Sequence, residues 1–130
     1  MSIRIVPLGS ARHRLEGLRL GTVRRPPRGV RKSQYARENW YDVWLPALAP
    51  SAALLRKTKV LQDKSQWRMF ERRYRSELKQ PEQSHLLDML AALSHQTNFS
   101  IGCYCEDEAR CHRSILRHVL SERGAKIERG

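Results

Sequence analysis

Three short stretches of the chain alternate apolar residues with polar or small ones, which is the pattern of β-strands. They cover residues 3–6, 18–23 and 99–104. The third is the clearest, because every second residue from Phe99 onward is apolar. Residues 126–128 are expected to add a short edge strand. The chain is therefore predicted to contain a small sheet.

Four longer stretches repeat apolar residues every three to four positions, which predicts amphipathic helices. The helices are expected over residues 52–59, over 65–79, from 81 onward and over 108–121. Ser51 and Ser65 suit the N-cap positions of the first two helices, and Pro81 suits the first turn of the third. Asp107 suits the N-cap of the last helix, and Gly124 is expected to end it. The residues of this last helix expected to face the core are Ile115, Leu116, Val119 and Leu120.

The elements follow the order strand, strand, helices, strand, helix, which is typical of an α/β protein with some parallel strand pairing. The sequence contains no internal repeat and no low-complexity segment, and 130 residues suit a single core. We therefore expect a small single-domain α/β sandwich over residues 1–130. Its sheet is expected to be short, at least partly parallel and flanked by helices.

Positive charge is concentrated at the start of the chain. The whole sequence has 25 Lys and Arg residues against 13 Asp and Glu, a net charge of +12. Residues 1–37 alone carry ten of the basic side chains and one acidic one. A concentrated basic segment raises the local concentration of polyanions. The charge pattern therefore favours a phosphate-containing ligand or nucleic acid as the partner.

The sequence has no run of 18 apolar residues, so no membrane span is expected. Residues 1–7 have neither the apolar stretch nor the cleavage site of a signal peptide. Three cysteines are an odd number, which argues against a secreted disulfide framework. We therefore expect a cytoplasmic protein with reduced thiols and no membrane partner.

The first candidate site is the loop of residues 24–32, which is rich in arginine, proline and glycine. If the strand before this loop is parallel to the strand at 99–104, both carboxyl ends open on one edge of the sheet, where open α/β sheets bind ligands. Guanidinium groups and the N–H groups of a helix N-terminus both bind phosphate. The candidate anion-binding residues are Arg24, Arg25, Arg28, Arg113 and Ser114. The alternative is a solvated surface loop.

The second candidate site is the segment after the third strand, which contains Cys103, Cys105, Cys111 and His112. Residues two apart on a strand face the same side, so Cys103 and Cys105 are expected side by side. A thiol at a helix start beside a histidine has a lowered pKa, which suits a nucleophile. In this interpretation Cys105 or Cys111 is the nucleophile, His112 is the base and Arg113 is an anion clamp.

Two further interpretations of the same segment stay open. Cys105 and Cys111 could form a reversible disulfide, which would make the segment a redox switch. Against a reactive thiol stand the acidic residues 106–108, which raise a thiol pKa. Alternatively, the cysteines and His112 are buried residues that only pack in the core.

Three cysteines and a histidine could also supply the ligands of a structural zinc ion. Their spacing differs from the paired CxxC-like hooks of zinc proteins. In addition, the neighbours Cys111 and His112 diverge by about 100° if both lie on a helix. The sequence therefore predicts neither a metal site nor a cofactor.

Two other groups of residues are expected to be structural. One face of the second predicted helix carries four basic residues, Arg68, Arg72, Arg75 and Lys79. We expect a solvated face there, although such a stripe could contact a phosphate backbone. Trp40, Tyr41 and Trp44 are expected in the core, because no exposed interleaved pattern marks them as stacking platforms.

Several segments resemble those of one family, in the same order along the chain. They are the arginine-rich residues 21–29, Leu-Ala-Pro-Ser at 48–51, the Phe…Tyr…Glu-Leu helix at 70–78 and the Cys…Cys-His-Arg-Ser ending at 105–114. This arrangement resembles the YeaO-like proteins, the family named domain of unknown function 488. The resemblance implies a compact α/β fold of bacterial, cytoplasmic type, and it implies no particular activity.

The favoured function is binding of a phosphate-bearing ligand or nucleic acid at the arginine-rich loop, beside the Cys-His-Arg start of the last helix. The alternatives are an enzyme with a cysteine nucleophile and histidine base, or a regulator that works through thiol or metal chemistry. All of them require that the loop at 24–32 and residues 111–113 be neighbours in space.

Overall fold

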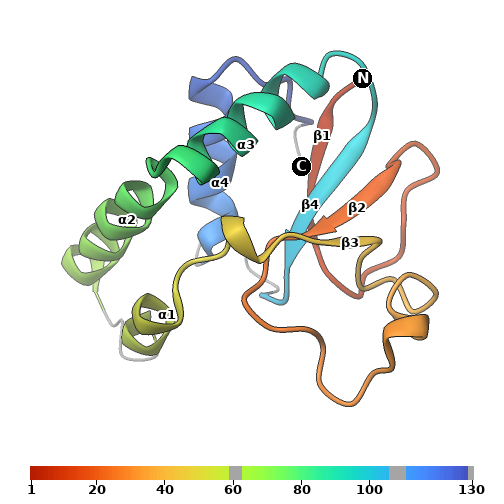
Figure 1. The fold of residues 1–130 in the computed structure, drawn as a ribbon, viewed down its shortest axis with the longest axis horizontal. Coiled ribbons are helices and arrows are strands. Elements are labelled where there is room, and N and C mark those ends of the chain that lie inside the picture. Colours follow the sequence, from red (N-terminus) through yellow and green to blue (C-terminus); the bar gives the residue numbers. More distant parts are fainter. Residues whose placement is uncertain (59–62, 106–110, 129–130) are drawn as a thin grey trace.

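The computed structural model describes residues 1–58, 63–105 and 111–128 (Figure 1). The strands are β1 (Ile3–Pro7), β2 (Leu18–Gly21), β3 (Val43–Trp44) and β4 (Phe99–Cys103). The helices are α1 (Ala52–Thr58), α2 (Lys64–Leu78), α3 (Pro81–Leu93) and α4 (His112–Glu122), and two 3₁₀ turns, η1 (Lys32–Gln34) and η2 (Pro46–Leu48), flank β3. In this part of the chain no helix is both long and apolar enough to cross a bilayer.

The four strands form one sheet in the order β1-β4-β2-β3, and every neighbouring pair is parallel. Strand β4 lies between β1 and β2, where Ile101 is level with Ile5 on one side and with Leu20 on the other. The strand closest to the end of the chain is thus central to the sheet. The predicted α/β class with a short parallel sheet flanked by helices is confirmed.

The helices gather on one face of the sheet, while the loops at 8–17 and 22–42 lie on the other side (Figure 1). All five residues of β4 are buried, as expected for a parallel strand covered on both faces. The predicted core residues of the last helix are all buried. With Ile101 of β4 and Tyr74 of α2 they belong to one apolar core between the sheet and the helices.

The N-cap of α2 lies two residues before the predicted cap, Ser65. The N-cap is Asp63, whose Oδ1 accepts a hydrogen bond of 2.9 Å from the backbone N–H of Gln66. Ser65, the predicted cap, lies inside the first turn and donates its hydroxyl to the same carboxylate at 2.8 Å. Both residue types cap helices well, and the carboxylate is also favoured by the positive end of the helix dipole. In α1 the predicted cap is confirmed, because Ser51 Oγ accepts from Leu54 N–H at 3.2 Å.

The last helix is shorter in the structure than in the prediction. It begins at His112 with Cys111 as its N-cap, and the predicted start at residue 108 and predicted cap Asp107 lie outside the described residues. The edge strand predicted at 126–128 is reduced to an isolated bridge between Ile3 and Ile127. Strand β3 was not predicted, because two residues are too few to show a period.

A buried ion pair lies on the loop-covered face of the sheet. Arg19 of β2 is fully buried, and its Nε donates to Glu16 Oε2 at 2.6 Å. Ser100 of β4 donates its hydroxyl to the same oxygen at 2.7 Å, and Arg19 Nη1 donates to the carbonyls of Ser10 and Asn39. Burial raises the pKa of Glu16, but the hydrogen bonds from Arg19 and Ser100 more than offset it and hold the pKa below its ordinary value. This network fastens two loops to the centre of the sheet.

Candidate functional site

The carboxyl ends of three strands meet at one edge of the sheet. Cys103 at the end of β4 is level with Pro7 of β1, and Gly102 is level with Gly21 of β2. The loop at 22–42 extends beyond this edge (Figure 1). Ligands bind along this edge in open α/β sheets. Two clusters of chemically active side chains are found here.

The first cluster surrounds a hollow of about 560 Å³. We call it the basic-aromatic hollow, and its lining residues are Arg25, Pro26, Pro27, Arg28, Trp40 and Tyr104. Two positive charges, two aromatic rings and no acidic side chain therefore line this hollow within the described part of the chain. The volume lies within the range of about 300–1,000 Å³ that small-molecule sites occupy.

Contacts between distant segments hold the hollow in shape. Tyr104 directly follows β4, and its hydroxyl donates to the carbonyl of Arg25 at 2.7 Å. The Trp40 and Tyr104 rings meet edge to face, with centroids 5.9 Å apart. Trp40 also packs on Gly9, where φ is +91° and an added Cβ would lie 3.0 Å from the indole. The wall of the hollow is thus largely preorganised.

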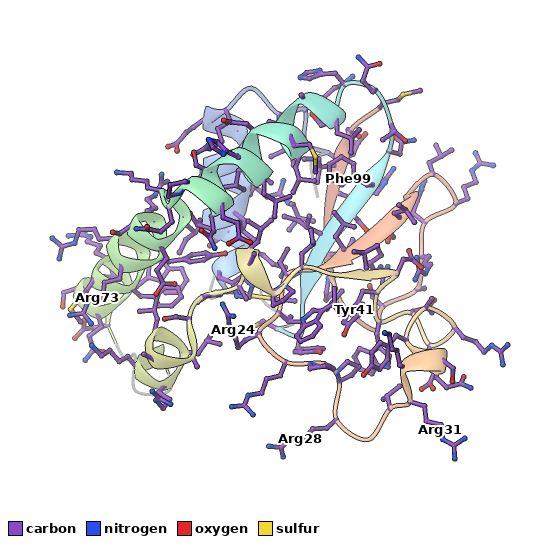
Figure 2. The ribbon with its side chains drawn as sticks, in the orientation of Figure 1. Arg24, Arg28, Arg31, Tyr41, Arg73 and Phe99 are labelled. Carbon is purple, nitrogen blue, oxygen red and sulfur yellow. A yellow bond between two sulfur atoms is a disulfide. The ribbon has the colours of Figure 1, made fainter. Side chains whose placement is uncertain are left out.

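Arg24 does not line this hollow. Its guanidinium is turned toward the segment before α1, where Nε donates to the carbonyl of Pro50 at 3.2 Å and Nη2 to that of Ala49 at 3.1 Å. Figure 2 shows Arg24 beside the helical layer and Arg28 at the far tip of the loop. The structure therefore divides the predicted arginine group, and Arg25 and Arg28 remain together.

Two other predicted anion-binding residues donate hydrogen bonds to backbone carbonyls of the protein itself. Arg113 is only 2% exposed, and its Nη2 donates to the carbonyl of Cys105 at 2.6 Å. Ser114 Oγ donates to the carbonyl of Cys111 at 2.9 Å. Arg113 supports the turn after β4, and Ser114 stabilises the first turn of α4. Neither lines the basic-aromatic hollow.

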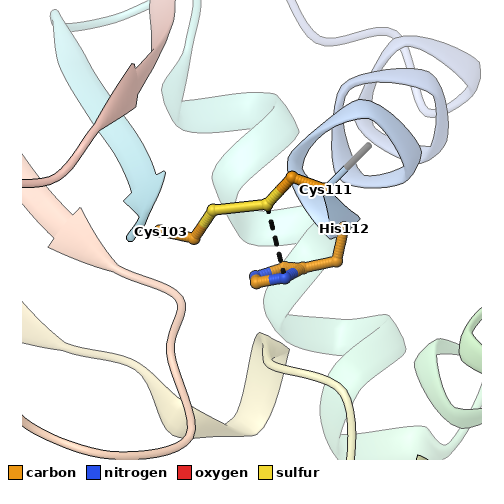
Figure 3. Close-up of side chains that lie close together, drawn as sticks. All are labelled: Cys103, Cys111 and His112. Carbon is orange, nitrogen blue, oxygen red and sulfur yellow. Dashed lines mark hydrogen bonds between the residues drawn. A yellow bond between two sulfur atoms is a disulfide. The ribbon is translucent and has the colours of Figure 1, made fainter. Parts of the chain in front are cut away.

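The second cluster consists of Cys103, Cys111 and His112, and we call it the thiol–imidazole cluster. Cys103 ends β4, Cys111 caps α4 and His112 is the first residue of that helix. The two cysteines are joined as a disulfide, and the His112 ring lies against it (Figure 3). All three residues are buried, with His112 the most exposed of them at 8%.

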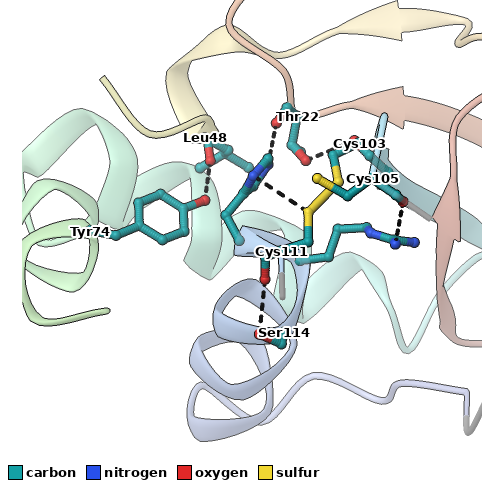
Figure 4. The surroundings of a disulfide bond; sticks show 10 residues. Thr22, Leu48, Tyr74, Cys103, Cys105, Cys111 and Ser114 are labelled. Atoms are coloured by element: carbon teal, nitrogen blue, oxygen red, sulfur yellow. Dashed lines mark hydrogen bonds between the residues drawn. A yellow bond between two sulfur atoms is a disulfide. The ribbon is translucent and has the colours of Figure 1, made fainter. Parts of the chain in front are cut away.

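The orientation of the His112 ring is fixed by a backbone carbonyl. Its Nε2 lies 2.7 Å from the carbonyl oxygen of Thr22, which can only accept, so Nε2 carries the proton (Figure 4). The other nitrogen, Nδ1, therefore presents its lone pair to Cys111 Sγ, 3.8 Å away. Burial lowers the pKa of His112 to about 4, although the bond to Thr22 opposes this effect. The imidazole is neutral at physiological pH.

Cys105 is not a member of this cluster, although it lies in the surroundings of the disulfide (Figure 4). It is the free, exposed cysteine of the chain, whereas Cys103 is buried. The side-by-side arrangement was expected from strand alternation, but β4 ends at Cys103, so this alternation does not extend to Cys105. The disulfide considered between Cys105 and Cys111 is replaced by the bond between Cys103 and Cys111.

Cys111 and His112 were expected to diverge if both lie on a helix. Cys111 instead has extended φ and ψ angles of −131° and 153°. The 100° divergence of neighbouring helical residues therefore does not apply to this pair. One ligand atom from each of Cys103, Cys111 and His112 can be chosen so that all lie within 4.8 Å of one another.

The basic stripe on α2 is partly neutralised. A hollow on this helix is lined by Ser65, Arg68, Glu71, Arg72 and Arg75. Arg75 Nε donates to Glu71 at 3.0 Å, and its Nη1 donates to Glu122 of α4 at 2.8 Å. These contacts raise the pKa of Arg75, led by its bond to Glu122. Glu71 and Arg75 are four residues apart, so this contact is an i,i+4 ion pair within the helix.

The sequence did not mark Trp40 and Tyr104 as site residues, and it placed Cys103 in the candidate segment without choosing it as a catalytic residue. Trp40 was expected in the core and is half-buried, with one side on the hollow. Tyr104 was assigned only to a strand, and the predicted nucleophile was Cys105 or Cys111 rather than Cys103. The available signal was position: Cys103 and Tyr104 are the residues that end and follow the central strand, where parallel sheets place their sites.

The two clusters are neighbours, as the spatial hypothesis required. The hydrogen bond from His112 to Thr22 joins the start of α4 to the segment leading into the arginine-rich loop. Tyr104, next to Cys103 in sequence, joins the same loop at Arg25. Cys103 and Cys111 also share an apolar cluster with Tyr41, against which Trp40 packs.

Comparison with known proteins identifies a family. A family model, DUF488-N3a, described as the active DUF488-N3 subclade, matches residues 3–124. No curated protein and no solved structure matches the chain. The matched range includes every described helix and strand and both clusters.

Proposed function

The chain belongs to the DUF488 family, as its resemblance to the YeaO-like proteins indicated, and on this premise we propose that it binds a nucleotide unit in the basic-aromatic hollow. By a nucleotide unit we mean one base with its phosphate. The observation that carries the proposal is the lining of the hollow, where Arg25 and Arg28 lie with Trp40 and Tyr104.

The aromatic rings explain why a base is preferred to a simple anion. Every nucleobase has a π-face, and stacking on an aromatic side chain stabilises binding by about 1–3 kcal/mol per base. Trp40 and Tyr104 offer such rings at the wall of the hollow. The indole Nε1 of Trp40 is also a buried donor without a partner in the described residues.

The arginines explain why the ligand should carry phosphate. Guanidinium groups form bidentate, charge-assisted hydrogen bonds with phosphate oxygens. Arg25 and Arg28 are both exposed, and the prolines between them restrict the backbone. Less entropy is therefore lost when the loop meets a ligand. The surrounding loop adds Arg31, Lys32 and Arg37, which increase the attraction of anions.

The thiol–imidazole cluster supports an enzymatic role less directly. A nucleophile must reach its substrate, and the Cys103 and Cys111 side chains are 1% and 2% exposed. Cys105 is exposed but lies outside the group formed with His112. A cysteine nucleophile with His112 as its base therefore remains an alternative prediction. The matched family is described as active, but this description names no reaction.

Calorimetric titration tests the proposal. AMP, inorganic phosphate and a short single-stranded oligothymidylate are titrated separately at low and at physiological salt. We expect AMP to bind at one site, on the order of 10-fold or more tightly than inorganic phosphate because the base stacks. Tighter binding of the oligothymidylate than of AMP would identify single-stranded nucleic acid as the source of the unit. Absence of binding by both AMP and the oligothymidylate at low salt would overturn the proposal.

A further inference from the structure

The thiol–imidazole cluster offers three possible metal-ligand atoms, one from the end of β4 and two from the start of α4. They are Cys103 Sγ at the end of β4, Cys111 Sγ at the N-cap of α4 and a ring nitrogen of His112 in the first turn, all within 4.8 Å of one another (Figure 3). Nδ1 is the ring nitrogen that lies 3.8 Å from Cys111 Sγ. Thiolate sulfur and imidazole nitrogen are the ligands that Zn²⁺ prefers. The set is independent of the basic-aromatic hollow and of its proposed ligand.

The hydrogen bonding of His112 matches that of a metal ligand. Ligating histidines usually donate their other ring N–H to a carbonyl or carboxylate, which fixes both the tautomer and the direction of the ring. Here Nε2 donates to the Thr22 carbonyl at 2.7 Å, and Nδ1 faces Cys111. An edge-to-face contact with the Tyr74 ring, with centroids 5.7 Å apart, holds the imidazole from a further side.

The backbone spacing of the two cysteines is wider than that of common disulfides. Their Cα atoms are 7.9 Å apart, whereas disulfides usually join Cα atoms about 4.4–6.8 Å apart. A tetrahedral zinc ion with bonds of about 2.3 Å to sulfur holds two thiolates about 3.8 Å apart. The larger span therefore suits two sulfurs that share an ion.

Charge balance also favours the ion in this buried position. Two thiolates and a neutral imidazole around Zn²⁺ carry no net charge. The cluster is surrounded by Leu8, Val23 and Tyr41, which are all buried, and an unbalanced charge among them would be costly. A neutral site with three protein ligands is thus compatible with the apolar environment.

We propose that the reduced protein binds one Zn²⁺ ion through Cys103, Cys111 and His112, with the fourth coordination position left to water or to a ligand. A phosphine reductant opens the disulfide by taking up one oxygen from water, which yields the phosphine oxide and two thiols. The ion then binds both sulfurs, and the two thiol protons pass to the solvent.

Cobalt substitution tests the site in the full-length protein. The chain is reduced with a phosphine under nitrogen and titrated with Co²⁺, which takes zinc sites and reports thiolate ligation by a near-ultraviolet charge-transfer band. We expect one equivalent to produce this band, and Zn²⁺ to abolish it. Cys103→Ser, Cys111→Ser and His112→Gln should each weaken binding by 10-fold or more, whereas Cys105→Ser, a matched change of an exposed thiol, should leave the spectrum unchanged.

Proton release gives a second readout that needs no variant. Adding Zn²⁺ to the reduced wild-type protein in weak buffer should release about two protons per ion bound. The proposal is overturned if the reduced protein gives neither the cobalt band nor proton release. It is also overturned if the band persists in Cys111→Ser and is lost in Cys105→Ser.

Discussion

The double variant Arg25→Gln/Arg28→Gln is expected to bind AMP on the order of 10²-fold more weakly than the wild type. Each guanidinium forms charge-assisted hydrogen bonds worth about 1.5–3 kcal/mol, and exposure to solvent reduces this value at both positions. The fold should be unaffected, because both side chains are exposed and Tyr104 bonds to the backbone carbonyl of Arg25 rather than to its side chain. Calorimetric titration with AMP measures the loss.

A matched variant separates local binding from general charge. Arg68→Gln/Arg72→Gln removes the same charge from the exposed face of α2, which lines a different hollow. We expect its affinity for AMP to stay within about twofold of the wild type. Equal losses in the two double variants would mean that net charge, and not the basic-aromatic hollow, attracts the ligand.

Glu16→Gln is expected to lower the free energy of unfolding by about 3–5 kcal/mol, because it leaves the buried Arg19 guanidinium without its counter-charge. Arg19 is fully buried and Glu16 is 2% exposed, so water cannot replace the missing carboxylate. The nearly isosteric amide keeps the packing and isolates the effect of charge. Urea denaturation measures the change: the midpoint concentration of urea should fall, while the dependence of the unfolding free energy on urea (the m-value) should stay the same.

The same pair predicts how stability depends on pH. The folded pKa of Glu16 lies below its value in the unfolded chain, because the hydrogen bonds of Arg19 and Ser100 outweigh burial. Its stabilising contribution is therefore complete above the ordinary glutamate pKa of 4.5 and is lost as the pH falls through the folded pKa. The difference in the free energy of unfolding between the wild type and Glu16→Gln should therefore become smaller in that acidic range.

An exposed ion pair provides the control for this variant. Asp88 pairs with Arg123, and the Asp88 side chain is 62% exposed. Asp88→Asn should change the free energy of unfolding by less than about 1 kcal/mol. A Glu16→Gln protein as stable as Asp88→Asn at neutral pH would show that the Arg19 network does not stabilise the fold.

The sequence predicted the secondary structure where a segment was long enough for its apolar residues to show a helix or strand period. The core positions of the last helix followed from residue spacing, the cap of α1 from cap chemistry, and an at least partly parallel sheet from the order of the elements. Arg19 could not be recognised as buried, because its partners come from the loops at residues 10 and 39 and from Glu16. Local patterns contain no information about such tertiary partners.

The predicted site residues lie near one edge of the sheet, but only some of them line the basic-aromatic hollow or belong to the thiol–imidazole cluster. Position after a strand was sufficient to indicate Arg25, Arg28, Cys111 and His112. Arg24 turns away because carbonyls of Ala49 and Pro50, some 25 residues later, accept its hydrogen bonds. Trp40 reaches the hollow because the whole loop at 22–42 folds back toward Tyr104, a path set by long-range contacts.

The indole N–H signals of the three tryptophans test the location of the ligand most directly. Trp40 lines the basic-aromatic hollow, whereas Trp67 lies on α2 against Phe70, with ring centroids 5.2 Å apart. Proton–nitrogen NMR spectra are recorded during titration with AMP, after assignment with single tryptophan-to-phenylalanine variants. We predict a saturable shift of the Trp40 signal while that of Trp67 stays in place. A Trp40 signal that does not move at saturating AMP, or a shift confined to Trp67, would contradict binding in the hollow.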